Sequence, residues 1–157
     1  MKIRKLREDD IGDIVAMIHD VMGPDDAKKA LQDMKISLGE HAPYKFEEFY
    51  VVEVNNKLLG AGGFWSLKYD PNIARLDWFV VRRSEQRKGI GTLLIKFLES
   101  RLKKQRIKMI LAETSSGNDY KAAVNFYMKN GFRLVSQIPG YWEDKTDWLY
   151  FAKRLGK

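Results

Sequence analysis

Residues 81–94, Val-Arg-Arg-Ser-Glu-Gln-Arg-Lys-Gly-Ile-Gly-Thr-Leu-Leu, join a β-type run to a helical one through a basic turn. The run before the turn is β-branched and aromatic, and the stretch after it carries apolar residues at helical spacing. Backbone N–H groups in the first turn of a helix lack partners, and the helix dipole adds positive charge there. Gly89 and Gly91 have no Cβ, so a phosphate can approach the main chain. The stretch therefore predicts an anion site between a strand and a helix.

The glycine spacing excludes two well-known nucleotide loops. The turn lacks Gly-x-x-x-x-Gly-Lys-Ser/Thr, the P-loop pattern, and it lacks Gly-x-Gly-x-x-Gly, the dinucleotide fingerprint. What remains is Gln86-x-x-Gly89-x-Gly91. Four cations in this stretch suit a multiply phosphorylated ligand, namely Arg82, Arg83, Arg87 and Lys88.

Composition narrows the class of protein. The chain has 157 residues, 45% hydrophobic and 31% charged, which suits one soluble domain with its own core. It has no cysteine, which excludes disulfides and thiolate sites, and its two histidines leave little material for zinc. The N-terminus is too charged for a signal peptide, and no apolar run reaches membrane-spanning length. We expect one cytoplasmic domain over residues 1–157, with no metal and no membrane partner.

The net charge of +7 does not by itself choose a partner. It suits nucleic acid, an acidic membrane or a polyanionic small ligand, and equally a solvated surface. The cations are scattered, with one dense patch in the glycine turn and another over residues 101–108. The second patch lies on the tail of a helix, where cations complement the dipole.

Periodicity predicts eleven elements in the order β-α-α-β-β-β-α-β-α-β-β. The expected helices cover 11–22, 25–38, 90–102 and 119–130, the last closed by a left-handed Gly131. The expected strands cover 3–7, 49–54, 58–67, 73–81, 107–113, 132–138 and 148–155. Consecutive middle strands predict antiparallel hairpins, and the strands that flank the third helix predict a parallel crossover. The result is an α/β fold with a mixed sheet and helices on both faces.

This order resembles the fold of the GCN5-related N-acetyltransferase (GNAT) family, and two signatures support the resemblance. Residues 81–91 look like the family's acetyl-CoA loop, in which Gln or Arg precedes Gly-x-Gly by three residues. Residues 123–132, Ala-Val-Asn-Phe-Tyr-Met-Lys-Asn-Gly-Phe, are similar to its second signature, Ala-x-x-Phe-Tyr-x-x-x-Gly-Phe. The two lie in the right order, and the resemblance covers essentially the whole chain. It implies a mostly antiparallel sheet of six or seven strands, a splayed parallel pair and about four helices.

Two positions depart from the family's pattern. Arg83 stands where the family often has Pro, which affects only the rigidity of the turn. Tyr120 stands where the family often has Asn, and we expect Asn118, two residues upstream, to supply that amide contact to the ligand.

The resemblance implies acetyl-CoA as the co-substrate. Its pyrophosphate would bind the amides of residues 87–92, and its pantetheine arm would pair with exposed main-chain groups of residues 79–81, as an added half-strand does. The expected acetyl-CoA contacts are Phe79, Val80, Val81, Gln86, Arg87, Lys88, Gly89, Ile90, Gly91, Thr92, Asn118 and Tyr127.

The resemblance also implies that Tyr127 is the acid that protonates the departing thiolate. An unperturbed thiol has a pKa of about 8.5 and a tyrosine one of about 10, so the transfer is slightly uphill unless the site adjusts either value. The alternative is that Tyr127 is a packing aromatic beside Phe126. A main-chain N–H near Val80 or Val81 would hold the oxyanion.

Two carboxylates are candidates for the general base. Asp77 lies on the fourth strand and Glu113 ends the fifth, and either could take a proton through water. The alternative is that each pairs with a neighbouring arginine or caps a loop, and that water alone removes the proton.

The acceptor pocket is expected between the first two helices and the connection of the last two strands. Aromatic residues crowd both regions, namely Tyr44, Phe46, Trp65, Tyr141 and Trp142, and carboxylates that suit a cationic amine lie beside them, at Glu143, Asp144 and Asp147. The same aromatics could shield a sheet edge or form a homodimer contact. His19 is more typical of a surface residue than of an acid or base, and His41 is not assigned a role.

The sequence therefore favours an N-acetyltransferase that moves an acetyl group from acetyl-CoA to a primary amine of a small molecule by direct attack in a ternary complex. One alternative acceptor is a protein N-terminus or lysine. Two others are a CoA-binding module without catalysis and a basic nucleic-acid-binding module. The last needs aromatics interleaved with cations on one face, and that pattern is missing, so we expect no nucleic-acid partner.

Overall fold

A computed structural model describes residues 1–37, 48–67 and 69–156. The strands are β1 (Lys2–Lys5), β2 (Glu48–Val54), β3 (Lys57–Leu67), β4 (Asp70–Val81), β5 (Met109–Ser115), β6 (Arg133–Ile138) and β7 (Trp148–Arg154). The helices are α1 (Ile11–Met22), α2 (Pro24–Ser37), α3 (Ile90–Lys104) and α4 (Lys121–Lys129). Single 3-10 turns precede α1 at Glu8–Asp10, α3 at Arg83–Glu85 and α4 at Asn118–Tyr120. The order of the strands and α-helices is the predicted one.

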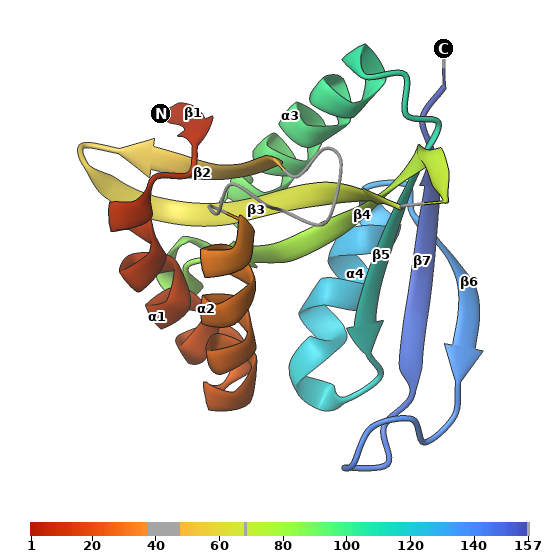
Figure 1. The fold of residues 1–157 in the computed structure, drawn as a ribbon. Coiled ribbons are helices and arrows are strands. Elements are labelled where there is room, and N and C mark those ends of the chain that lie inside the picture. The colour runs from red at the N-terminus through yellow and green to blue at the C-terminus, as the bar shows by residue number, and fades with distance from the viewer. Residues whose placement is uncertain (38–47, 68, 157) are drawn as a thin grey trace.

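All seven strands form one sheet in the order β1-β2-β3-β4-β5-β7-β6 (Figure 1). Every neighbouring pair is antiparallel except β4 and β5, which run parallel. The mixed α/β fold and its parallel crossover are thus confirmed. Both ends of the chain contribute to the sheet, since β1 lies at one edge and β7 lies beside β6 at the other.

Helices cover both faces of the sheet. Alternate residues of β2 point to opposite sides, so this strand contributes to a core on each face. Phe49 and Val51 join the core beneath α1 and α2, together with Ile14, Ile18, Ala30 and Met34. Tyr50 and Val52 join the core beneath α3 and α4, together with Leu94, Leu98, Ile110, Tyr127 and Phe151. We call these sides the α1–α2 face and the α3–α4 face.

Several element boundaries differ from the prediction. Residues 70–72, which the prediction left between two strands, are the start of β4. There the Asp70 carboxylate accepts the Asn72 N–H at 2.9 Å, and Asp70 still pairs with Leu67. The fifth strand begins two residues late and runs to Ser115, because polar Thr114 and Ser115 pair with β7. The last predicted helix begins as a 3-10 turn, and Gly131 takes the expected left-handed conformation at φ +84°.

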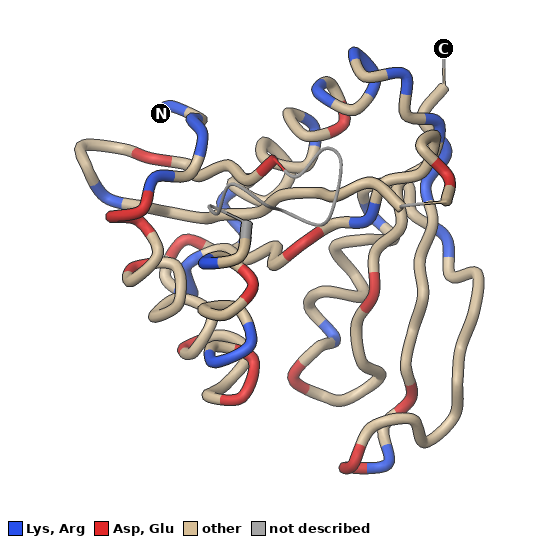
Figure 2. Tube along the Cα trace, in the orientation of Figure 1, with Lys and Arg blue, Asp and Glu red and all other residues tan. Residues whose placement is uncertain are grey.

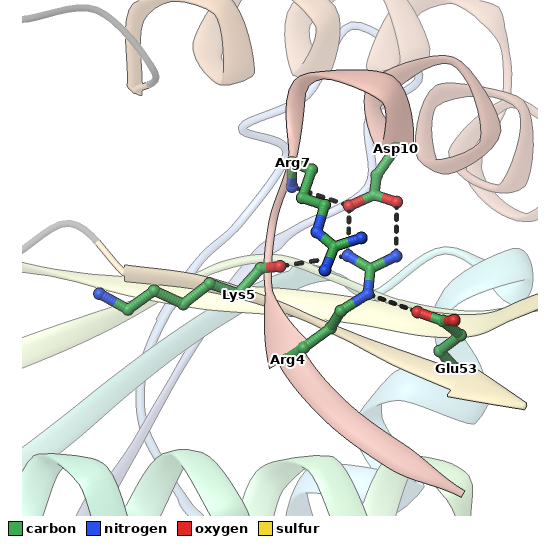
Figure 3. Close-up of polar contacts among 5 residues, drawn as sticks. All are labelled: Arg4, Lys5, Arg7, Asp10 and Glu53. Atoms are coloured by element: carbon green, nitrogen blue, oxygen red, sulfur yellow. Dashed lines mark hydrogen bonds and ion pairs between the residues drawn. The ribbon is translucent and has the colours of Figure 1, made fainter. Parts of the chain in front are cut away.

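Arg4 ties the first strand to its neighbours (Figure 3). Its guanidinium donates two hydrogen bonds to the Asp10 carboxylate, at 2.7 and 2.9 Å, and a third to Glu53 on β2. Asp10 also accepts the Arg7 N–H at 2.7 Å, so it fixes the turn before α1 and does not cap the helix with its side chain. The Arg4 and Asp10 side chains are only 13% and 9% exposed. The network therefore holds β1, β2 and the start of α1 together.

Arg4→Ala should lower the free energy of unfolding by about 3 kcal/mol at neutral pH, because it leaves buried carboxylates without their cation. Urea denaturation measures the loss, and exposed Arg133→Ala on β6 is the control that should change little. The hydrogen bonds from Arg4 lower the pKa of Asp10 below its ordinary 3.8. The stabilisation is therefore complete above pH 3.8 and declines as pH falls through the lower folded value. The gap between wild type and variant should narrow in that window, and a constant gap would contradict the account.

Candidate active site

The parallel strands β4 and β5 separate soon after they meet. They pair only at Ile73–Met109, Ala74–Ile110 and Arg75–Leu111. Beyond those pairs β5 continues along β7, and β4 continues along β3 to Val81. The edge of β4 from Leu76 to Val81 therefore faces β5 without pairing to it. This region, which we call the split, is the splayed pair expected from the sequence.

A β-bulge shapes the edge of β4 within the split. Val80 pairs with Ala61 and Asp77 pairs with Gly63, so Trp78 and Phe79 lie opposite the single residue Gly62. Trp78 has φ +36°, a conformation that a bulky residue rarely adopts. Gly62 is required here, because a Cβ at that position would lie 2.8 Å from the Phe79 ring. The bulge changes the direction of the main chain at residues 79–81, which were predicted to pair with the pantetheine arm.

The glycine turn leads from the split to the N-terminus of α3. Arg87 and Gly89 both have positive φ, at +62° and +86°. No side chain in the described part of the chain caps α3, whose first internal hydrogen bond runs from the Leu93 N–H to the Gly89 carbonyl at 2.9 Å. The N–H groups of residues 90–92 therefore lack intrahelical partners. They lie where the sequence predicted an anion site.

The turn needs glycine at its two glycine positions for different structural reasons. A Cβ on Gly89 would meet nothing within 4 Å, so its positive φ is what demands glycine. A Cβ on Gly91 would lie 2.9 Å from the Phe126 ring of α4. The same ring stacks on Phe79, with centroids 5.2 Å apart. Phe126 thus joins the β4 edge, the start of α3 and the helix that carries Tyr127.

Most cations of the turn are bound to neighbouring carboxylates. Arg82 donates to both oxygens of Asp13 on α1, at 2.8 and 3.0 Å, and to the Leu58 carbonyl at 2.8 Å. Arg83 pairs with Asp20, and Lys88 pairs with Glu85 at 3.1 Å. Arg87 forms no ion pair within the described ranges. Of the predicted patch of four cations, Arg82 and Arg83 therefore fix the turn to α1, and Lys88 pairs within the turn.

Other charges are spread along the chain (Figure 2). Arg101, Lys103 and Lys104 lie in the last turn of α3, at the opposite end from the glycine turn. This position complements the helix dipole, as the sequence indicated.

The structure describes the surroundings of two further predicted acetyl-CoA contacts. Gln86 turns back, and its side-chain amide donates to the Val81 carbonyl at 3.1 Å, which braces the turn. Asn118 is exposed in the turn before α4. Neither position identifies a ligand contact, so both assignments remain predictions.

Tyr127 lies on α4 and is 7% exposed. Its ring contacts those of Phe126, Phe132 and Phe151, with centroids 5.4 to 5.7 Å apart. Burial raises the pKa of Tyr127 to about 12. The hydroxyl therefore stays protonated throughout the neutral range, which is the state that a proton donor requires. The raised pKa also makes complete proton transfer from Tyr127 to a thiolate less favourable than the unperturbed pKa values suggested.

The candidate bases share the α1–α2 face. Ala74 and Ala112 point into the other core, so Arg75 and Glu113, which alternate with them, point to this side. Glu113 forms an ion pair with Arg75, which is the alternative role that the sequence left open for it. Its Oε2 atom is buried without a hydrogen bond. Asp77 lies two residues beyond Arg75 on the strand and pairs with Gly63 across to β3.

Aromatic side chains cover the same face over β7. Tyr141 lies 4.6 Å from Trp148 and 4.9 Å from Trp142 between ring centroids, and Trp148 lies 5.3 Å from Tyr150. The Arg75 guanidinium lies 5.4 Å from the Trp65 ring and 5.9 Å from that of Tyr150. Three aromatics of this set were expected near the acceptor, namely Trp65, Tyr141 and Trp142. Tyr44, Phe46 and His41 lie outside the described residues, and His19 is exposed at the end of α1.

The acidic residues of the β6–β7 connection serve its own structure. Asp144 accepts the Thr146 N–H at 3.0 Å and its hydroxyl at 2.6 Å, and Asp147 accepts the Gly140 N–H at 2.9 Å. These hydrogen bonds lower the pKa of both carboxylic acids. Both carboxylates therefore stay negatively charged at neutral pH while they hold the connection in shape.

Two contacts near the split have no counterpart in the predictions. The Trp78 indole N–H donates to Asp33 on α2 at 2.8 Å, and the Tyr120 hydroxyl donates to Asp26 on α2 at 3.2 Å. Both partners are distant in sequence, so no local pattern could have revealed them. Within residues 1–37, 48–67 and 69–156, no helix is long and apolar enough to cross a bilayer. No three potential metal ligands gather in that part of the chain.

The fold recurs in solved structures that match almost the full length of this chain. A protein from Desulfovibrio desulfuricans assigned to the GNAT family is 18% identical with a TM-score of 0.87, and 99% of each chain is covered. The Escherichia coli ribosomal-protein-S18-alanine N-acetyltransferase is 19% identical with a TM-score of 0.79, over 99% of this chain and 94% of that one. An aminoglycoside 6'-N-acetyltransferase complexed with coenzyme A is 17% identical with a TM-score of 0.77, over 100% and 98%. At these identities the similarity establishes the fold.

Sequence similarity establishes the family. The family model described as "Acetyltransferase (GNAT) family" matches residues 12–132, well over half of the 157 residues. The match includes the glycine turn, the split and Tyr127. The chain therefore belongs to the GNAT family of acetyltransferases.

Proposed function

We propose that this chain transfers the acetyl group of acetyl-CoA to a primary amine of a small molecule, by direct attack while both substrates are bound. The observation that carries the proposal is a pair of main-chain regions that lie close together in sequence. One is the bulged edge of β4 on the side that leaves β5, and the other is the uncapped N-terminus of α3. Such a pair suits a ligand with hydrogen-bonding amides at one end and phosphates at the other.

The residues of these two regions fit acetyl-CoA. The N–H groups of residues 90–92 would bind the pyrophosphate, and Arg87 would add a charge-assisted contact. The β4 edge at residues 79–81 would pair with the pantetheine amides. The ligand supplies an activated acetyl group as a thioester, and the chain must orient it, stabilise an oxyanion and supply a proton. A main-chain N–H near Val80 or Val81 is the proposed oxyanion donor.

Tyr127 is the proposed proton donor to the leaving sulfur. Its place on α4 beside Phe126, which contacts both Phe79 and the Gly91 position, supports the assignment. Because its pKa is about 12, the hydroxyl acts as a hydrogen-bond donor that transfers its proton only as negative charge builds on sulfur.

The amine must lose a proton, and Asp77 or Glu113 would accept it through water. Both lie on the α1–α2 face, where Arg75 binds Glu113. The aromatic set that includes Trp65 and Tyr141 would line the acceptor side. We further propose that the enzyme works in the cytoplasm without a nucleic-acid, membrane or metal partner, and that its exposed aromatics would support a homodimer.

A panel of amines tests the proposal. Wild-type protein, acetyl-CoA and single small amines, peptide N-termini or lysine peptides are mixed, and thiol release is followed with mass analysis of each acceptor. We expect acetylation of at least one small primary amine in preference to the peptides. Binding of CoA without turnover of any amine would refute the catalytic proposal, and preference for a peptide would replace the acceptor.

A further inference from the structure

Helix α2 is hydrogen-bonded to both sides of the split. Asp33 accepts the indole N–H of Trp78, which lies on β4, at 2.8 Å. Asp26 accepts the hydroxyl of Tyr120, which follows β5, at 3.2 Å. The two aspartates are seven residues apart, so they lie on the same side of α2, two turns from each other. Since β4 and β5 do not pair in this region, α2 connects them across the split on the α1–α2 face.

Tyr120 is the part of this connection that crosses from the β5 side. Its ring is half-buried, and its hydroxyl lies near the carboxylates of Asp26, Asp119 and Asp144. Burial and these negative charges raise the pKa of Tyr120 to about 12, so the hydroxyl remains a donor to Asp26 throughout the neutral range. The contact lies on the face that also carries Arg75, Glu113 and Tyr150.

We propose that Tyr120 determines acceptor specificity, because with Asp26 it closes one end of the split to an extended peptide and leaves room for a compact amine. The inference rests on the proposed amine acetylation. An extended chain needs about 4.8 Å between its backbone and that of each neighbouring strand, and space for side chains on both sides. On this inference, the Tyr120 ring, hydrogen-bonded to Asp26 on α2, stands in the path that such a chain would take. A compact amine does not have to pass it.

The test compares one amine in two settings: the best small amine of the panel, and the same amine carried at the end of a hexapeptide. In Tyr120→Ala we expect kcat/KM for the hexapeptide to rise about tenfold relative to that for the small amine. Tyr120→Phe, which removes only the hydrogen bond, should shift the ratio less. KM for acetyl-CoA should stay within about twofold in both variants.

Tyr69→Ala is the matched control, because it removes a tyrosine that is 92% exposed in the turn before β4. It should leave the ratio unchanged. Asp26→Ala removes the partner instead of the ring, and it provides a second route to the same shift if Tyr120→Ala does not fold. A ratio unchanged in these variants while wild type acetylates small amines would overturn the inference alone. Absence of turnover with every amine would overturn the proposed function and this inference with it.

Discussion

Tyr127→Phe should reduce kcat by about 10²-fold or more, the size typical of losing a positioned general acid. Phenylalanine keeps the ring contacts with Phe126, Phe132 and Phe151, so the fold should survive. KM for acetyl-CoA should change by less than about twofold, because the hydroxyl would act on the leaving sulfur as charge develops there. Steady-state kinetics at saturating acetyl-CoA measures the effect.

Tyr50→Phe is the matched control for this variant. Tyr50 is also buried, at 4% exposure, and its pKa is also raised to about 12, but its hydroxyl donates to Glu48 far from the glycine turn in sequence. It should lower stability and leave kcat unchanged. An equal loss of kcat in the two variants, or none in Tyr127→Phe, would remove Tyr127 as the acid.

The raised pKa of Tyr127 also sets an expectation for pH. A tyrosine acid loses activity as pH rises through its pKa, and here that value has moved from 10 to about 12. The rate should therefore show no tyrosine-dependent fall near pH 10. A fall in the wild-type rate near pH 10 that is absent from Tyr127→Phe would contradict the raised pKa of Tyr127.

Gly89→Val should weaken CoA binding by about 10²-fold. Gly89 has φ +86°, and a β-branched residue in the left-handed region is strained by roughly 1–2 kcal/mol. The turn would relieve that strain by changing its conformation and turning the N–H groups of residues 90–92 away from their shared direction. Because a Cβ there meets no protein atom within 4 Å, the loss would not come from a clash inside the fold. Isothermal titration with CoA measures it.

Gly140→Val provides the control for backbone strain in general. Gly140 also has positive φ, at +59°, and a Cβ there also meets nothing within 4 Å, but it lies in the connection between β6 and β7. CoA affinity should be unaffected by it. If Gly89→Val binds CoA as tightly as wild type does, the glycine turn is not the phosphate site.

Local patterns were sufficient for the order of the elements. The apolar spacing of α3, the glycine before it and the left-handed Gly131 each depend on neighbouring residues, so the sequence predicted them well. The boundary of β4 was missed because pairing with β3 extends the strand through a segment whose own residues favour a turn. The parallel crossover followed from the order of strands and helices.

The site was less predictable because its details depend on tertiary partners. The cations of the glycine turn looked available, but Arg82 meets Asp13, 69 residues away. The bulge at Trp78 depends on glycine across the sheet and on Asp33 of α2. Tyr120 departed from the family's pattern, and only its contact with Asp26 gives that departure a structural role. Long-range pairings of this kind leave no periodic signal in one sequence.

Hydrogen–deuterium exchange with and without CoA tests the central claim most directly. The account predicts that CoA slows exchange of the amides in residues 79–81 and 87–92, where β4 lacks a partner on its β5 side and α3 lacks a cap. The amides of β6 should exchange equally in both samples. Protection confined to the basic tail of α3 around residues 101–106, with none at the glycine turn, would contradict the account.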